Sequence, residues 1–166
     1  MKQSLDIWPD RFRSFSFWLS VGLGSGLIKP APGTWGSVFA LMLGYLIIEN
    51  GVPVQLFGAA IVGVSVLGVV TINRIEKLSG VHDAPEIVID EVAGMWIAML
   101  PLYHLGTGYV ALLIAFGLFR VFDILKPWPI GWLDKQVTGG FGVMIDDIVA
   151  GIFAVLGIEI FATLII

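Results

Sequence analysis

The stretch IVIDEVAGMWIAML, residues 87–100, sets two adjacent carboxylates, Asp90 and Glu91, ahead of an apolar run. Later in the chain, the stretch VMIDDIVAGIFAVL repeats the arrangement with Asp146 and Asp147. Ionised groups are costly to remove from water unless something pairs with them. Two acid pairs at the starts of two apolar helices therefore predict a common site at one face of an apolar environment.

The composition is typical of a membrane protein. Of the 166 residues, 57% are hydrophobic and only 13% are charged, whereas soluble domains carry about 25% charged residues. The chain has no cysteine, which excludes disulfides, thiolate catalysis and zinc–thiolate sites. A formal net charge of -4 leaves no basic surface for nucleic acid, so we expect no nucleic-acid partner.

The apolar runs predict an all-α, polytopic helical membrane protein that forms a single domain over residues 1–166. About five transmembrane or re-entrant helices are expected, from the runs 36–48, 54–72, 92–105, 109–122 and 148–166. Spanning a bilayer takes about 20 residues, so the shorter runs must rely on flanking residues or enter from one side. The glycine-rich stretch 15–28 predicts an amphipathic or re-entrant N-terminal segment.

The distribution of basic residues predicts the topology. The two tight connections, ENGVP and GTG, contain no lysine or arginine. The other connections carry all nine, namely Lys2, Arg11, Arg13, Lys29, Arg74, Lys77, Arg120, Lys126 and Lys135. Because cytoplasmic loops collect Lys and Arg, the N-terminus and both acid pairs are expected on the cytoplasmic side. Two further acids on that side, Glu86 and Asp134, are expected to be solvated loop residues.

Each acid pair has two interpretations. An aspartate ahead of a helix can accept backbone N–H bonds as an N-cap, which explains one acid of each pair but leaves the other without a role. Alternatively, the four carboxylates hold a divalent cation, because they would otherwise repel one another in a medium of low dielectric constant. Oxygen ligands without cysteine or histidine suit Mg²⁺, Mn²⁺ or Ca²⁺ rather than Zn²⁺. Spacing alone leaves both interpretations open.

The stretch FRVFDILKPW holds candidate phosphate contacts. Arg120 and Asp123 are three residues apart and share one helix face, so they form either an interfacial ion pair or part of a phosphate site. Lys126 stands just before a proline, where the helix is expected to end. Its side chain is predicted to contact either a phosphate or lipid head groups.

Two loops supply the remaining candidates. In KPAPGTWGS, which ends at Ser37, Thr34 is expected to cap the following helix. This loop is also a candidate phosphate-binding site. In GVHDAPE, His82 stands beside Asp83 and is the only histidine expected on the cytoplasmic side. It is therefore the candidate general acid–base, although an isolated loop histidine is usually just solvated.

Four blocks carry a resemblance to a known family: GSGLIKPAPGTWGS, GVHDAPEIVIDEVAGMW, FRVFDILKPWPIGWLDK and GGFGVMIDDIVAG. In this order, over residues 21–151, the chain resembles the phosphatidylglycerophosphatase A family of bacterial inner-membrane lipid phosphatases. One departure is Gly131, where a basic residue is common in the family.

The resemblance implies Mg²⁺-dependent removal of the terminal phosphate from phosphatidylglycerol phosphate, giving phosphatidylglycerol for phospholipid synthesis, with Mn²⁺ as a possible substitute. It implies metal ligation by Asp90, Glu91, Asp146 and Asp147. His82, Asp83 and Asp123 are the expected catalytic residues, and Thr34, Ser37, Arg120 and Lys126 the expected phosphate contacts. The expected partners are the lipid substrate and the surrounding membrane lipids. Both metal-assisted hydrolysis and an aspartyl-phosphate intermediate are compatible with these residues.

Two other functions use similar acidic clusters. A cation transporter needs acids in the middle of its spans, and only Glu159 fits that requirement. A lipid phosphotransferase of the CDP-alcohol type would show a longer aspartate–glycine–arginine–aspartate signature, which this sequence lacks. Both remain alternatives to the phosphatase.

Overall fold

The computed structural model describes residues 3–165, and in this part of the chain the regular structure is entirely helical. Three short 3₁₀ helices lie near the N-terminus: η1 (Leu5–Ile7), η2 (Arg11–Arg13) and η3 (Gly22–Leu27). The α-helices are α1 (Phe15–Ser20), α2 (Pro32–Glu49), α3 (Val54–Ser79), α4 (Ile89–Ala98), α5 (Leu102–Leu105), α6 (Tyr109–Leu125), α7 (Ile130–Gln136) and α8 (Gly139–Ile165). The predicted all-α class is confirmed.

Within residues 3–165, two helices are long and apolar enough to cross a membrane, α3 and α8. They have 26 and 27 residues, and at 1.5 Å per residue each is about 40 Å long, more than the ~30 Å hydrocarbon core of a bilayer. Helices α2 and α6 are shorter, with 18 and 17 residues. Five crossings therefore remain a prediction, supported by helix length for α3 and α8.

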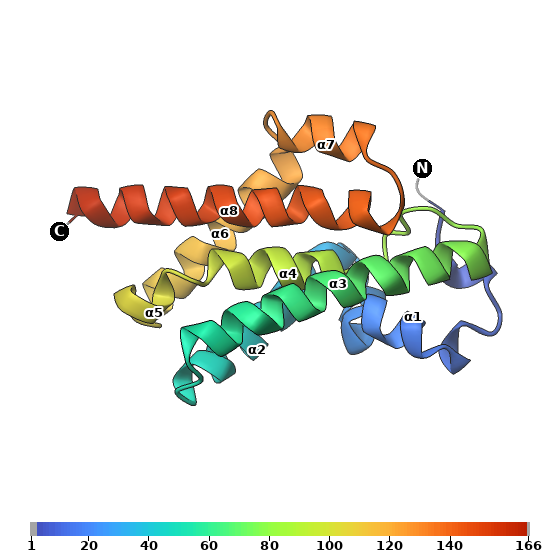
Figure 1. The fold of residues 1–166 in the computed structure, drawn as a ribbon, viewed down its shortest axis with the longest axis horizontal. Coiled ribbons are helices and arrows are strands. Elements are labelled where there is room, and N and C mark those ends of the chain that lie inside the picture. Colours follow the sequence, from blue (N-terminus) through green and yellow to red (C-terminus); the bar gives the residue numbers. More distant parts are fainter. Residues whose placement is uncertain (1–2, 166) are drawn as a thin grey trace.

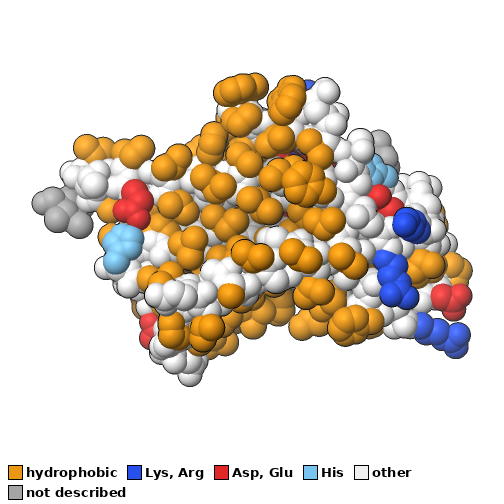
Figure 2. Space-filling model, viewed as in Figure 1, with side chains coloured by type: hydrophobic (Ala, Val, Ile, Leu, Met, Phe, Trp, Pro, Cys, Tyr) orange, Lys and Arg blue, Asp and Glu red, His pale blue; other side chains and the backbone are white. Residues whose placement is uncertain are grey.

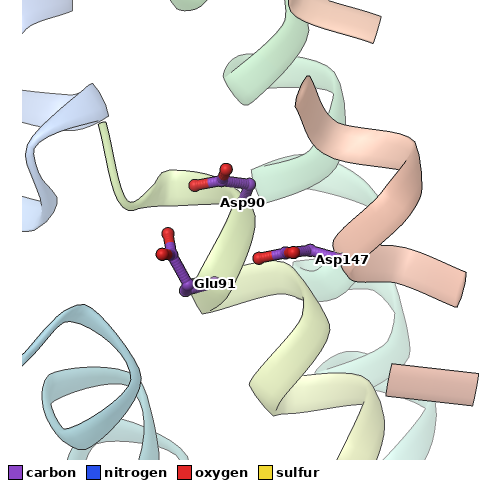
Figure 3. Close-up of side chains that lie close together, drawn as sticks. All are labelled: Asp90, Glu91 and Asp147. Atoms are coloured by element: carbon purple, nitrogen blue, oxygen red, sulfur yellow. The ribbon is translucent and has the colours of Figure 1, made fainter. Parts of the chain in front are cut away.

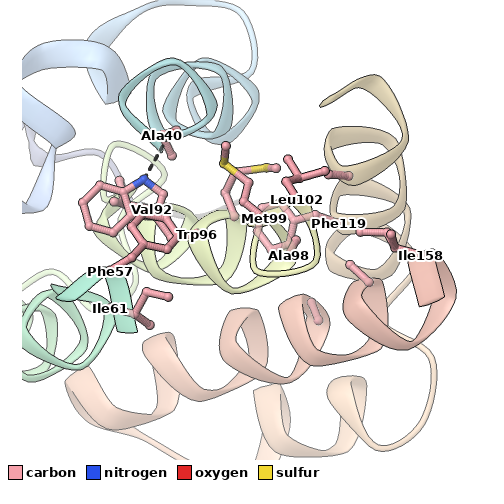
Figure 4. Close-up of a cluster of buried hydrophobic side chains, with 14 of the residues drawn as sticks. Ala40, Phe57, Ile61, Val92, Trp96, Ala98, Met99, Leu102, Phe119 and Ile158 are labelled. Carbon is pink, nitrogen blue, oxygen red and sulfur yellow. Dashed lines mark hydrogen bonds between the residues drawn. The ribbon is translucent and has the colours of Figure 1, made fainter. Parts of the chain in front are cut away.

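Helix α4 lies at the centre of the bundle and is too short to span. The apolar run expected at 92–105 is divided into α4 and α5, because Pro101 cannot continue a hydrogen-bonded helix. Most α4 side chains are buried against α2, α3, α6 and α8 (Figure 4). Trp96 Nε1 donates to the Ala40 carbonyl of α2 at 2.9 Å, which satisfies its polar atom inside this core. The run is thus apolar because it is buried in protein.

The two ends of the molecule differ in charge. Helix α3 ends near the region where α4 and α8 begin (Figure 1). Hydrophobic side chains cover the middle of the visible face. Lys and Arg side chains gather at the end of the molecule where α3 ends, on the right of the view (Figure 2). At the opposite end, His104 of α5 pairs with Glu159 of α8 at 3.2 Å. This arrangement suits a bundle whose middle lies in lipid.

The N-terminal segment packs against the outside of α3 and α2. Phe17 and Val21 are buried, whereas Phe15 and Leu23 expose most of their apolar surface. The helix breaks at Leu23 and Gly24, which adopt positive φ angles of 54° and 107°. The segment is therefore a short, interrupted, amphipathic element.

Candidate metal and phosphate site

A cavity of about 340 Å³ opens between the starts of α4 and α8, the end of α6, helix α7 and the loop before α4. Seven carboxylates line it: Asp83, Asp90, Glu91, Asp123, Asp134, Asp146 and Asp147. Arg120 and Lys126 are the permanently charged bases in its lining, and His82 stands at the cavity as well. Acids that are far apart in the sequence thus share one space, with a large excess of negative charge.

Three of the carboxylates form a compact group. One oxygen each from Asp90, Glu91 and Asp147 lies within 4.8 Å of the others (Figure 3). The first two belong to the first turn of α4 and the third to α8. Because the three side chains come from two helices, the group exists only where those helices pack closely.

Two glycines allow this close packing. A Cβ on Gly151 of α8 would collide with the backbone carbonyl of Gly94 in α4, and a Cβ on Gly94 would lie 2.6 Å from the carbonyl of Asp147. Asp90 and Asp147 each precede their contact glycine by four residues, and so share its helix face. This spacing in DEVAG and DIVAG explains why Asp147, rather than its neighbour Asp146, joins the group.

The N-cap interpretation does not hold. Helix α4 has Val88 at its N-cap, with no side-chain cap. Helix α8 begins at Gly139, so Asp146 and Asp147 lie in its third turn rather than at its start. The expectation that both acid pairs begin helices is therefore correct for α4 and wrong for α8.

Several buried atoms of the cavity have no hydrogen-bond partner among the described residues: Asp90 Oδ1, Glu91 Oε2, Asp146 Oδ1, Asp147 Oδ2 and Arg120 Nε. Leaving a buried polar atom unpaired is costly, and more so for a charged group. Clustered carboxylate oxygens are the donors that Mg²⁺ and Mn²⁺ prefer. The residues present therefore fit a divalent cation.

Asp146 lies in the same cavity but has a different partner. Lys126 Nζ is 2.5 Å from Asp146 Oδ2 and 2.5 Å from Asp134 Oδ1 of α7. Burial alone would lower the pKa of Lys126, but the two carboxylates outweigh it and raise the pKa, so the ammonium stays charged. Asp134 is thus an ion-pair partner, in contrast to the solvated residue expected from the sequence.

Arg120 and Asp123 form the expected ion pair on one face of α6. Arg120 Nη1 also donates to Ser37 Oγ at 3.3 Å, and Ser37 Oγ donates in turn to the Gly33 carbonyl at 2.8 Å. Ser37 therefore holds the Arg120 guanidinium through this hydrogen bond. Ser37 itself does not line the cavity.

The start of α2 differs from the expectation for Thr34. The helix begins at Pro32, with Ala31 as its N-cap, so Thr34 lies in the first turn and does not cap it. Thr34 is also absent from the cavity lining. The first turn of α2 instead meets the acidic group at Gly33, where any Cβ would collide with Glu91 Oε1. This close backbone approach closes one side of the acidic group.

His82 has a partner that its sequence position did not suggest. Its Nδ1 lies 2.5 Å from Glu76 Oε1 at the end of α3, across the turn at Gly80. A carboxylate accepts, so this contact favours the tautomer with the proton on Nδ1, and in that tautomer Nε2 is the acceptor. The His82 side chain remains 58% exposed, so it can meet a ligand that enters from the surface.

Glu86 contradicts the expectation of a solvated acid, because it is only 4% exposed. Ser4 Oγ donates to one of its carboxylate oxygens, and Leu5 N donates to the other at 3.2 Å. Two residues further on, Val88 N donates to the Ser20 carbonyl at 2.8 Å. The N-terminal segment thus holds the loop that carries His82 and leads to Asp90.

Comparison with known proteins gives a consistent result. The family model described as Phosphatidylglycerophosphatase A matches residues 18–162. A protein of Haemophilus influenzae named phosphatidylglycerophosphatase A is 44% identical over 139 residues, covering 83% of this chain and 83% of that protein. Its namesake from Escherichia coli is 41% identical over 151 residues, covering 90% and 86%.

A third relative carries a different name. A Bacteroides thetaiotaomicron protein described as a putative phosphatidylinositol-3-phosphatase is 32% identical over 145 residues, covering 86% of this chain and 90% of that protein. No solved structure gives a significant match.

Proposed function

Because the chain belongs to the phosphatidylglycerophosphatase A family, we propose that it hydrolyses the terminal phosphomonoester of phosphatidylglycerol phosphate to give phosphatidylglycerol. The observation that carries the proposal is the group formed by Asp90, Glu91 and Asp147, whose oxygens converge in a cavity that also holds two basic side chains. A dianionic phosphate cannot approach seven carboxylates unless positive charge is supplied there.

The three grouped carboxylates would hold Mg²⁺, with Mn²⁺ as a substitute, and Asp146 is the remaining candidate ligand through its unpartnered Oδ1. When bound, such a cation supplies Lewis-acid polarisation of a phosphate oxygen and neutralises part of the negative charge. The absence of cysteine from the chain leaves oxygen donors as the natural ligands for this ion.

The basic residues bind and orient the phosphate. The unpartnered Nε of Arg120 is a donor available to a phosphate oxygen, while its Nη1 is held by Asp123 and Ser37. Lys126, fixed between Asp134 and Asp146, places a second positive charge at the cavity. Preorganised donors of this kind stabilise the charge that develops on the transferred phosphoryl group.

His82 is the proposed proton-transfer residue. With Nδ1–H directed to Glu76, its Nε2 can accept a proton from an attacking water and return it to the departing glycerol oxygen. Asp123 and Asp83 stand at the same cavity and are the remaining catalytic candidates. An Asp123 nucleophile that forms an aspartyl-phosphate is the competing route, and trapping of a phosphorylated protein would distinguish it.

The proposed location is the bacterial inner membrane, with the cavity on the cytoplasmic face and the N-terminus inside. Support comes from the two helices long enough to span and from the one-sided distribution of Lys and Arg. A lipid phosphatase needs its cavity at the level of the head groups, and this cavity is lined by the first turn of α4, the first three turns of α8 and the last two turns of α6.

The test is phosphate release by the purified full chain from phosphatidylglycerol phosphate, phosphatidylinositol 3-phosphate and phosphatidic acid, with and without chelator. Release from the first substrate that stops on chelation and returns with Mg²⁺ is the expected result. Preference for phosphatidylinositol 3-phosphate would replace the substrate assignment, and undiminished release after complete metal removal would refute the metal-dependent mechanism.

A further inference from the structure

A second cleft, of about 410 Å³, lies away from the acidic cavity, between the N-terminal segment and the last turns of α3. We call it the N-terminal cleft. Arg13 and Ser14 line it from the N-terminal segment, and Arg74 lines it from α3. None of the residues of the N-terminal cleft belongs to the acidic cavity.

The charged side chains of the N-terminal cleft have a net positive charge that an anion could balance. Asp10 also lines it and lies 3.7 Å from Arg13, an exposed and loosely held pair. Arg74 makes no ion pair or hydrogen bond with the described residues through its side chain. Two arginines facing one aspartate leave a single net positive charge, which matches the single negative charge of a phosphodiester.

The position of the cleft points to a lipid rather than a soluble anion. Arg74 follows the uncharged apolar stretch 54–72 by two residues, so it stands where α3 leaves the hydrocarbon region. Two apolar side chains border the cleft, Phe15 with 77% and Leu78 with 53% of its surface exposed. A positively charged cleft with exposed apolar side chains beside it complements a molecule that has an anionic head group and acyl chains.

From this geometry we propose that the N-terminal cleft binds the phosphodiester head group of an anionic phospholipid, with Arg74 and Arg13 contacting the phosphate. The bound lipid joins the N-terminal segment to α3. Since that segment also holds the active-site loop through Glu86, the lipid stabilises the arrangement of the loop. The site is separate from the catalytic cavity and does not depend on the reaction proposed for it.

The test measures the melting temperature of the delipidated full chain in neutral detergent during titration with short-chain phosphatidylglycerol. Parallel titrations use short-chain phosphatidylcholine, whose phosphate is already balanced by choline, and inorganic phosphate. The variants are Arg74→Gln and the double variant Arg13→Gln with Arg74→Gln. Lys77→Gln is the matched control, because Lys77 carries the same charge one turn further along α3 but does not line the cleft.

Phosphatidylglycerol is expected to raise the melting temperature of the wild type and of Lys77→Gln. Arg74→Gln should need about fivefold more lipid for the same effect, and the double variant should lose the response. Because Arg74 and Arg13 are exposed, neither change should impair folding, and native mass spectrometry would count the retained lipids independently. An unchanged response in the double variant would overturn the site, and an equal response to inorganic phosphate or phosphatidylcholine would overturn its assignment to anionic lipid.

Discussion

Asp90 and Asp147 show how two single residues, placed alike on two helices, form the centre of the acidic group. Each lies one helical turn before a glycine at which α4 and α8 touch, so the two carboxylates reach the same space from equivalent positions. Glu91 joins them because it follows Asp90 and is covered by Gly33 of α2. Asp146 is adjacent to Asp147 but lies about 100° around the helix, where Lys126 meets it.

Replacing a grouped carboxylate by its amide removes charge and little volume. Asp90→Asn and Asp147→Asn should each lower turnover by a factor of about 10² or more, equivalent to about 2.7 kcal/mol of barrier. Steady-state phosphate release measures this, with melting temperatures to exclude unfolding. Glu159→Gln is the control, because that acid pairs with His104 at the opposite end, and its turnover should stay within a few-fold. Near-normal turnover in both aspartate variants would remove the metal-site interpretation.

The variant Asp146→Asn tests whether Asp146 is a ligand of the cation in addition to Asp90, Glu91 and Asp147. If its main role is to hold Lys126, Asp146→Asn should keep the increase in melting temperature that Mg²⁺ gives the wild type, because ligand binding stabilises only a protein that can bind. Asp147→Asn should lose that increase. The measurement is thermal unfolding with and without Mg²⁺ after chelation. Loss of the increase in Asp146→Asn as well would make Asp146 a ligand.

At the scale of elements, the site depends on how closely α4 and α8 approach. Gly94 and Gly151 permit backbone contact between them, which neither helix requires for its own formation. The same logic applies to α2, where Gly33 lets the backbone approach Glu91. Small residues at helix contacts are common in membrane bundles for this reason.

Gly151→Ala tests the closeness of α4 and α8. The added Cβ would meet the Gly94 carbonyl and lie 3.0 Å from Ile97 Cβ, both of which belong to the packed α4. We expect a loss of about 1–3 kcal/mol of stability and a weaker response to Mg²⁺, because α8 must move away from α4. Gly63→Ala on α3 is the matched control: its Cβ meets nothing within 4 Å, so stability should be unchanged or rise by up to about 1 kcal/mol through helix propensity. Equal behaviour of the two variants in thermal unfolding would contradict the packing argument.

At the scale of the whole molecule, the bundle has a charged end that holds the acidic cavity and a sparsely charged end, and an apolar middle joins them. Lys2 lies outside the described residues. Among the described residues, the basic side chains belong to the N-terminal segment, to connections, to α7 and to the last two turns of α3 and α6. The opposite end carries Glu49 and the His104–Glu159 pair. Because basic residues are retained on the cytoplasmic side of a membrane, we expect the end that holds the acidic cavity to face the cytoplasm.

The absence of native cysteine makes this orientation testable with single-cysteine variants. Thr138 and Asn50 are both exposed and lie in connections at opposite ends. In intact cells, a membrane-impermeant thiol reagent should label Asn50→Cys, and should label Thr138→Cys only after the membrane is opened. The reverse pattern would invert the topology, and labelling of both from outside would contradict the separation of the two ends by a membrane.

The sequence alone determined the all-helical class, the approximate positions of the long apolar helices and the set of acids that line the cavity. These follow from local composition and from charge distribution, which need no knowledge of distant contacts. The spacing of Asp90 and Asp147 to their glycines was also present in the sequence, but it has meaning only once α4 and α8 are known to touch.

Only the tertiary structure decided which carboxylates form a group, because ligand distances of a few ångströms depend on the packing register of separate helices. It likewise decided that Glu86 is buried under the N-terminal segment, that Glu76 pairs with His82, and that Asp134 pairs with Lys126. Each of these contacts joins residues of different elements or connections, so no single helix brings the two partners together. Local spacing predicts a partner on the same helix, as for Arg120 and Asp123, but a partner on another element depends on the distance that the fold sets between the two elements.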